Sequence, residues 1–172
     1  MRFRNLFLYA LPLLLCSCLG MPRGIKPVNN FDVGSYMGQW YEIARMENSF
    51  EKGLNYVTAN YSLNDDETVR VVNQGYHQQK GETKTANGTA KFVDSPDTGY
   101  LKVSFFKPFY SSYVVFKLDP NYQYAYVSGY NNKYLWLLSR TPTISDAVLK
   151  DFYQTAKAYG YDTSKIIQVE QQ

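Results

Sequence analysis

The chain has 172 residues, a length that suits one domain of ordinary size rather than two. Its formal net charge is +3 and its mean hydropathy is −0.40. These values argue against a nucleic-acid-binding protein, which needs a clear basic excess, and against a bundle of membrane-spanning helices. The 17 Tyr, 10 Phe and 2 Trp favour a sheet-based fold, because aromatic side chains fit a pleated surface.

The N-terminal residues have the layout of an export signal. Two arginines precede an apolar run over residues 6–15, which is too short to span a bilayer. The next residues, Leu15-Cys16-Ser17-Cys18, resemble the bacterial lipobox, in which the last cysteine is lipidated and becomes the N-terminus after cleavage. The resemblance implies a signal peptide over 1–17 and lipidation of Cys18, although Cys16 is unusual at its position. The alternative is an ordinary cleaved signal whose cysteines are incidental.

The segment after the signal is predicted to connect a membrane anchor to a folded domain. Residues 18–35 contain several Pro and Gly and no sustained periodicity, so they are predicted to be a lipidated tether. The folded domain is predicted over 36–172. Both cysteines precede it, so it has no disulfide. Leu19 replaces the Asp that typically retains lipoproteins in the inner membrane, which favours the outer membrane with the domain facing the periplasm.

From residue 40 onward, apolar and polar side chains alternate over short segments that turn residues separate, as is typical of β-strands. In one segment Ala86, Gly88 and Ala90 share a face, and such small inward residues leave room inside a barrel. Eight segments are predicted to be strands, namely 40–47, 54–63, 68–79, 83–93, 99–106, 112–118, 122–130 and 133–140. Sequential antiparallel pairing of these strands predicts a closed up-and-down β-barrel, which leaves no exposed edge.

The period becomes helical only near the C-terminus. Apolar residues recur there every three or four positions, at Ile144, Val148, Phe152, Ala156 and Tyr159. This single stripe predicts one helix packed on the outside of the barrel. Thr143 is the expected N-cap and Gly160 the expected end of the helix. Residues 166–169 are predicted to form a short final strand.

Three motifs connect this pattern to a known family. Residues 38–45, Gly-Gln-Trp-Tyr-Glu-Ile-Ala-Arg, resemble the G-x-W-Y-E-[IV]-A-R signature of the lipocalins. Residues 137–142 resemble the conserved segment at the end of their last barrel strand. Residues 118–122 lie where the family has its T-D-Y turn, with Pro120 and Asn121 in place of Thr and Asp. The domain is therefore similar to the lipocalins, and most of all to the bacterial outer-membrane lipoprotein lipocalins.

The resemblance implies an all-β fold: an eight-stranded antiparallel up-and-down barrel with one C-terminal α-helix on its outside and a short final strand. In the family the Trp of the signature, here Trp40, plugs the closed end of the barrel. The family's late Arg, here Arg140, lies across the indole as a cation–π contact. Gly38, Trp40 and Arg140 are therefore expected to be structural, and no residue is expected to be catalytic.

Strand alternation and the register of the family predict which side chains line a ligand pocket. They are Val57, Ala59, Tyr61, Val71, Asn73, Ala86, Ala90, Val103, Phe105, Tyr113, Val115, Tyr126, Ser128, Tyr134, Trp136 and Leu138. An apolar, aromatic-walled cavity suits an acyl chain, with a polar head near the mouth. The resemblance implies a fatty acid or a lysophospholipid as the ligand. No cofactor and no metal ion are expected.

Two other functions stay open at this point: a structural or adhesive envelope protein whose barrel is filled, and a lipid-modifying enzyme on the same fold. The enzyme is disfavoured because no cysteine follows Cys18 and His77 is the only histidine, which is expected to be a solvated strand residue. The expected partners are the lipid ligand and, through the anchor, the membrane, but no nucleic acid. The oligomeric state is left open, with a homodimer as one option.

Overall fold

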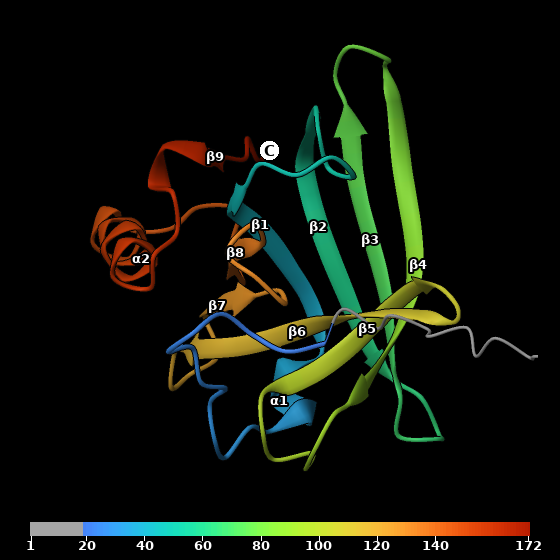
Figure 1. The fold of residues 1–172 in the computed structure, drawn as a ribbon. Coiled ribbons are helices and arrows are strands. Elements are labelled where there is room, and N and C mark those ends of the chain that lie inside the picture. Colours follow the sequence, from blue (N-terminus) through green and yellow to red (C-terminus); the bar gives the residue numbers. More distant parts are fainter. Residues whose placement is uncertain (1–18) are drawn as a thin grey trace, which may run out of the picture.

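The computed structural model describes residues 19–172, so the signal peptide and Cys18 lie outside the described residues. Eight antiparallel strands pair in sequence, and β1 also pairs with β2 and β8, which closes a barrel (Figure 1). The strands are β1 (Gly38–Met46), β2 (Leu54–Leu63), β3 (Val69–His77), β4 (Glu82–Phe92), β5 (Tyr100–Phe106), β6 (Phe109–Leu118), β7 (Tyr124–Ser128) and β8 (Leu135–Ser139). The predicted up-and-down barrel is confirmed, with strand ends that differ by a few residues.

The remaining elements are α1 (Val33–Tyr36), α2 (Asp146–Ala158), the 3-10 turn η1 (Thr163–Lys165) and β9 (Ile166–Gln168). The predicted outer helix and final strand are therefore present, whereas α1 and η1 had no sequence signal. The N-cap of α2 is Ser145, not Thr143, because the Ser145 hydroxyl accepts the Val148 N–H. Within the described residues no helix is long and apolar enough to cross a membrane.

Helix α2 covers one side of the barrel (Figure 1). Its residues Phe152 and Ala156 are almost fully buried in an outer hydrophobic layer that includes Leu135 and Leu137 of β8. The phenol of Tyr126 on β7 donates a hydrogen bond to the Asp151 carboxylate of α2, at 2.6 Å. Tyr126 therefore belongs to this outer layer, and the prediction that it lines the interior is wrong.

Ser128 on β7 is likewise on the outer side. Its hydroxyl lies 2.7 Å from the hydroxyl of Tyr161, which follows α2. The inward residues of β7 are Ala125 and Val127, which pack in the inner cluster. All four residues from 125 to 128 have 0% exposure, so both faces of this strand are core. Alternation of apolar and polar residues cannot show which of two buried faces points inward. The prediction that Ser128 lines the interior is wrong for that reason.

The N-terminal segment is packed rather than loose. Ile25 and Phe31 are buried, and the backbone of Val28 bonds to Val115 and Gly99. Gly20 N–H donates to the phenol oxygen of Tyr100 on β5. Residues 19–31, expected as part of a tether, are thus part of the folded domain.

The C-terminus completes the barrel wall. Strand β1 pairs with β2 only over residues 38–41, and β9 pairs with the upper part of β1 instead. Beyond β9, the backbone N–H of Tyr56 donates to the Glu170 carbonyl. The side-chain amide of Gln171 donates to the carbonyls of Glu42 and Val57. Residues 170–171 therefore fill the gap, here called the seam, where β1 and β2 no longer pair with each other.

The lower end of the barrel is closed by Trp40 and Arg140. The Arg140 guanidinium carbon lies 3.9 Å from the centre of the Trp40 ring, and Trp40 is fully buried. The guanidinium also donates to the carbonyls of Ser35 (2.7 Å) and Gln39 (2.9 Å). This is the arrangement that the family resemblance implies. Gly38 has φ +90°, a left-handed backbone that favours glycine, and a Cβ there would lie 3.5 Å from Arg140.

The turn at residues 118–122 is ordered although it departs from the family pattern. The Asp119 carboxylate accepts the N–H groups of Asn121 and Gln123, and the Tyr122 carbonyl accepts from Arg140 Nε. Asp119 therefore supplies the hydrogen bonds of this turn without a Thr at the next position.

We expect Arg140→Lys to lower the free energy of unfolding by about 2–4 kcal/mol. An ammonium cannot reach both carbonyls and also stack on the indole, so charge-assisted hydrogen bonds and part of the cation–π contact are lost. Urea unfolding followed by fluorescence checks this. Lys157→Arg on the exposed face of α2 is the control. A loss below about 0.5 kcal/mol in Arg140→Lys would contradict a structural role for the guanidinium.

Candidate functional site

The lower half of the barrel interior is filled by aromatic side chains. Tyr36 from α1, Tyr61 from β2 and Tyr113 from β6 meet across the barrel, with the Tyr113 hydroxyl 2.7 Å from that of Tyr36 and 3.0 Å from that of Tyr61. Burial raises the pKa of all three phenols above the ordinary value, so they are neutral hydrogen-bonding groups. Beneath them the Tyr36 ring packs on Trp40, with ring centres 4.8 Å apart. Any ligand space therefore lies above this layer.

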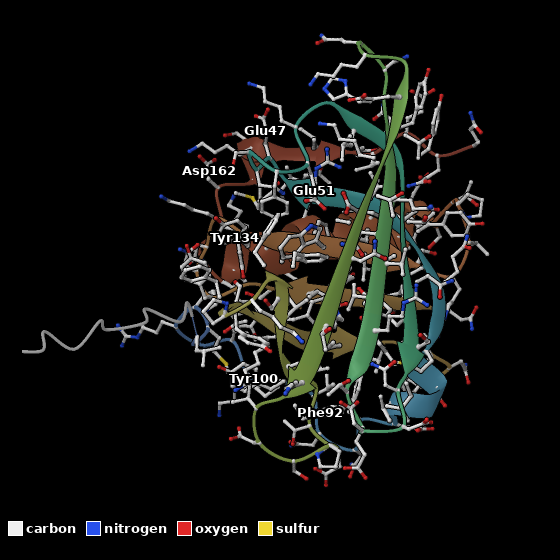
Figure 2. The ribbon with its side chains drawn as sticks, turned by 90° about the vertical axis from the view of Figure 1, so that its right-hand side faces the viewer. Glu47, Glu51, Phe92, Tyr100, Tyr134 and Asp162 are labelled. Carbon is white, nitrogen blue, oxygen red and sulfur yellow. The ribbon has the colours of Figure 1, made fainter. Side chains whose placement is uncertain are left out.

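The upper half is walled by smaller and more polar residues. Strands β2–β4 place Ala59, Gly75, Ala86 and Gly88 on the interior side by their pairing registers. The opposite wall holds Trp136 of β8. Figure 2 shows Glu51 and Tyr134 in this upper part and Phe92 near the lower end. The interior thus changes from close-packed rings below to small side chains above.

A β-bulge in β1 places a charged pair in the upper interior. Glu42 pairs with Leu138 and Arg45 pairs with Trp136, and the register shifts by one residue between them. Because Leu138 and Trp136 belong to the inner cluster, Glu42 and Arg45 also face inward. Their side chains form an ion pair of 2.6 Å and are almost completely buried.

The loop that follows β1 adds a second carboxylate to this pair. Glu51 is buried, and its carboxylate accepts from Trp136 Nε1 at 3.1 Å and from Asn48. Arg45 donates to the backbone carbonyls of Glu51 and Leu54. Burial and the neighbouring Glu51 raise the pKa of Glu42 well above its usual value. One guanidinium therefore faces two carboxyl groups in this set of residues, here called the carboxylate cluster (Glu42, Arg45, Glu51). The cluster has no net charge when one of its two carboxyl groups is protonated.

Three buried polar atoms in the upper interior have no hydrogen-bond partner among residues 19–172. They are Arg45 Nε, Asn73 Oδ1 and His77 Nδ1. Asn73 and His77 lie on the same face of β3 as the inward Val71. His77 is only 8% exposed, so the prediction of a solvated histidine is wrong. Buried polar atoms are normally bonded, so a polar group or a water inside the barrel is needed to satisfy these three.

Ten of the sixteen predicted lining residues pack in the inner cluster: Ala59, Tyr61, Val71, Ala90, Val103, Phe105, Tyr113, Val115, Trp136 and Leu138. Asn73 faces the same interior. Tyr134 lies at the upper end, where its ring stacks on Trp136 and on Phe50. Ala86 has the inward register but is exposed, because β4 above Thr89 has no partner on β5 within the described chain.

Val57 faces the upper interior opposite Gly75, as predicted, although it packs outside the inner cluster. A register shift in β2 lies between Asn55 and Thr58, and Val57 packs with Leu54 and Val169 in a small separate cluster. Tyr126 and Ser128 are therefore the two predicted lining residues that lie on the outer face of their strand. The residues that sequence reasoning missed are Glu42, Arg45 and Glu51. The available signal for a buried ion pair was the presence of two oppositely charged residues, Glu42 and Arg45, within the signature motif.

A groove of about 470 Å³ opens where β4 and β5 separate. Its lining includes Gly88, Phe105 and Lys107. A Cβ on Gly88 would lie 2.9 Å from the Phe105 ring, so only glycine allows this ring to approach β4. The groove interrupts the wall next to the upper interior.

Comparison with known proteins agrees with this geometry. The family model described as "Lipocalin-like domain" matches residues 31–171. The chain is 53% identical over 170 residues to the outer membrane lipoprotein Blc of Vibrio cholerae, covering 98% of this chain and 99% of the relative. It is 49% identical to the Blc lipoprotein of Escherichia coli K12, covering 91% of this chain and 88% of the relative.

More distant proteins share the fold. The chain is 34% identical to temperature-induced lipocalin-1 of Arabidopsis thaliana, covering 84% of this chain and 81% of the relative. Among solved structures, the cockroach allergen Per a 4 superposes with a TM-score of 0.68 at 21% identity, covering 89% of this chain and 96% of that one. Since the family model and these relatives span most of the sequence, the chain belongs to the lipocalin-like family.

Proposed function

We propose that this protein is an outer-membrane lipoprotein that holds one lipid in the upper half of its barrel, for storage, transport or envelope maintenance. The observation that carries the proposal is the interior itself. A sealed aromatic floor lies beneath a region of small side chains in which three buried polar atoms need a partner. Burial of each CH₂ of an acyl chain contributes about 0.8 kcal/mol, so a long chain binds usefully without charge pairing. The bacterial relatives are outer membrane lipoproteins by name, which supports the anchor and its membrane.

The carboxylate cluster bears on which lipid is held. Arg45 already donates to Glu42 and to two backbone carbonyls, which leaves two of its five N–H groups, one on Nε and one on Nη1. A free fatty-acid carboxylate in this region would meet two more carboxyl groups and one engaged cation. A lysophospholipid, which keeps an uncharged ester and hydroxyl near the barrel and its charges outside, suits this environment better. We therefore place a lysophospholipid-like ligand ahead of a fatty acid.

A filled barrel is the second candidate, because Tyr36, Tyr61 and Tyr113 already occupy the lower interior. In that case the protein would serve as a structural envelope lipoprotein. The two functions differ in whether the folded domain takes up lipid. The bacterial relatives carry the name of a lipoprotein and not of an enzyme.

Residues 19–172 freed of lipid and mixed with lysophosphatidylethanolamine should show one bound lipid by native mass spectrometry. Trp136→Arg should abolish this uptake while the domain stays folded, because a bulky cation replaces the indole in the upper interior. Tyr159→Arg introduces the same charge outside the barrel and should bind normally. Absence of uptake by the folded natural domain would favour the filled barrel.

The raised pKa of Glu42 makes stability depend on pH in a defined direction. Above the usual pKa of Glu, the folded chain keeps a proton that the unfolded chain has lost, so stability falls as pH rises until Glu42 ionises in the folded state. Each pH unit in this range lowers the free energy of unfolding by about 1.4 kcal/mol. Glu42→Gln should therefore show a flatter dependence than the natural protein in urea unfolding between about pH 5 and pH 8. Glu47→Gln, at an exposed site directly after β1, should leave the dependence unchanged.

Lipidation at Cys18 is tested in cells. Cys18→Ser should lose incorporation of radiolabelled palmitate, because the acceptor thiol is absent. Cys16→Ser should keep it. Label retained in Cys18→Ser would assign the modification to Cys16 and disprove the proposed anchor.

A further inference from the structure

The two ends of the barrel differ in charge. Because the strands run up and down in turn, the loops after β1, β3, β5 and β7 lie at one end, here called the mouth rim (residues 47–53, 78–81, 107–108 and 129–134). The other three connections lie at the floor end. Figure 1 shows the β1–β2 and β3–β4 loops at the top and the β2–β3 and β4–β5 loops at the bottom.

Each loop of the mouth rim carries one exposed lysine: Lys52, Lys80, Lys107 and Lys133. Of the acids at this end, Glu51 is buried against Arg45, and Glu47 and Glu82 are exposed. The three floor-end connections (64–68, 93–99 and 119–123) have no Lys or Arg. Their acids are Asp65, Asp66, Glu67, Asp94, Asp97 and Asp119. The barrel is therefore basic at its mouth and acidic at its floor.

The mouth end also exposes aromatic rings. Phe50 is 59% exposed in the first loop, and Phe106 (82%) and Phe109 (62%) flank the β5–β6 turn on both sides of Lys107. These are three of the six large hydrophobic side chains exposed within residues 19–172. Exposed rings grouped at one end of a domain indicate an interaction surface. Phenyl rings interspersed with lysines suit the headgroup region of a membrane, where aromatic and basic side chains are favoured.

We propose that the mouth rim docks on the surface of an anionic phospholipid bilayer. The lysines contact lipid phosphates, and Phe50, Phe106 and Phe109 enter the headgroup layer. The acidic floor end is repelled by the same surface, so charge fixes which end faces the membrane. The opening of the barrel then faces the lipids, whether or not the barrel takes one up.

Amide hydrogen exchange on the full, naturally processed protein tests the orientation without depending on ligand uptake. The protein is reconstituted in vesicles that contain phosphatidylglycerol and, separately, in vesicles of phosphatidylcholine alone. Amides of residues 47–53, 106–109 and 129–134 should exchange more slowly with phosphatidylglycerol. Amides of 64–68 and 93–99 should exchange equally in both. Equal exchange of the rim in both vesicles, or slowing at the floor end, would overturn the proposal.

Charge reversal with a matched control identifies the residues responsible. The triple variant Lys52→Glu, Lys107→Glu, Lys133→Glu should lose the protection, by about fivefold in docking equilibrium for each lysine removed. The triple variant Lys26→Glu, Lys150→Glu, Lys157→Glu makes the same change in net charge at exposed sites off the rim and should keep it. Loss of protection in both variants would mean that net charge, not the rim, drives binding, which would refute the proposal.

Phe106→Ser tests how much the aromatic rings contribute to membrane docking. Because the Phe106 side chain is largely exposed, its removal should not unfold the domain. It should weaken rim protection and leave thermal unfolding unchanged. Full protection in this variant would exclude insertion of the β5–β6 turn into the headgroup layer.

Discussion

The guanidinium of Arg140 contacts each of the segments that close the lower end of the barrel. Arg140 follows the last barrel strand, yet it contacts the indole of the first strand and the carbonyls of Ser35, Gln39 and Tyr122. These contacts join the end of α1, the start of β1 and the β6–β7 turn at one point. With the floor fixed in this way, Tyr36 can pack on Trp40 and meet Tyr113 above it. The sealed lower half leaves only the upper interior for a ligand.

Much of the fold was predictable because its determinants are local. Period-two alternation gave eight strands, one helical stripe gave α2, and the signature around Trp40 fixed the floor. The face of β7 was not predictable, because α2 covers its outer side and residues 125–128 are all core. Alternation shows which face is buried only where the other face is solvated. The packing of residues 19–31 was also hidden, since a segment without periodicity gives no signal for docking on a barrel.

The candidate site departed from prediction where the strands bulge. The register shift between Glu42 and Ala44 turns Arg45 inward, whereas simple alternation places it outside. A second shift, in β2 between Asn55 and Thr58, leaves Val57 facing the interior opposite Gly75, but packed in a small cluster of its own with Leu54 and Val169. Burying an ion pair costs solvation that a hydrophobic pair would not lose, so the carboxylate cluster is poorly explained as a stability device. Its position next to Trp136 makes the upper interior polar on that side of the barrel.

The seam closed by the C-terminal residues has a practical consequence for handling the protein. Gln171 bonds to the carbonyls of both Glu42 and Val57, one residue before the chain ends. A purification tag or reporter fused after Gln172 would therefore begin directly beside the hydrogen bonds that join the C-terminus to the barrel wall. Exopeptidase removal of a few residues would break the same hydrogen bonds, which lie beside the carboxylate cluster. Preparations that lack these terminal residues would lose the hydrogen bonds that Glu170 and Gln171 make to β1 and β2.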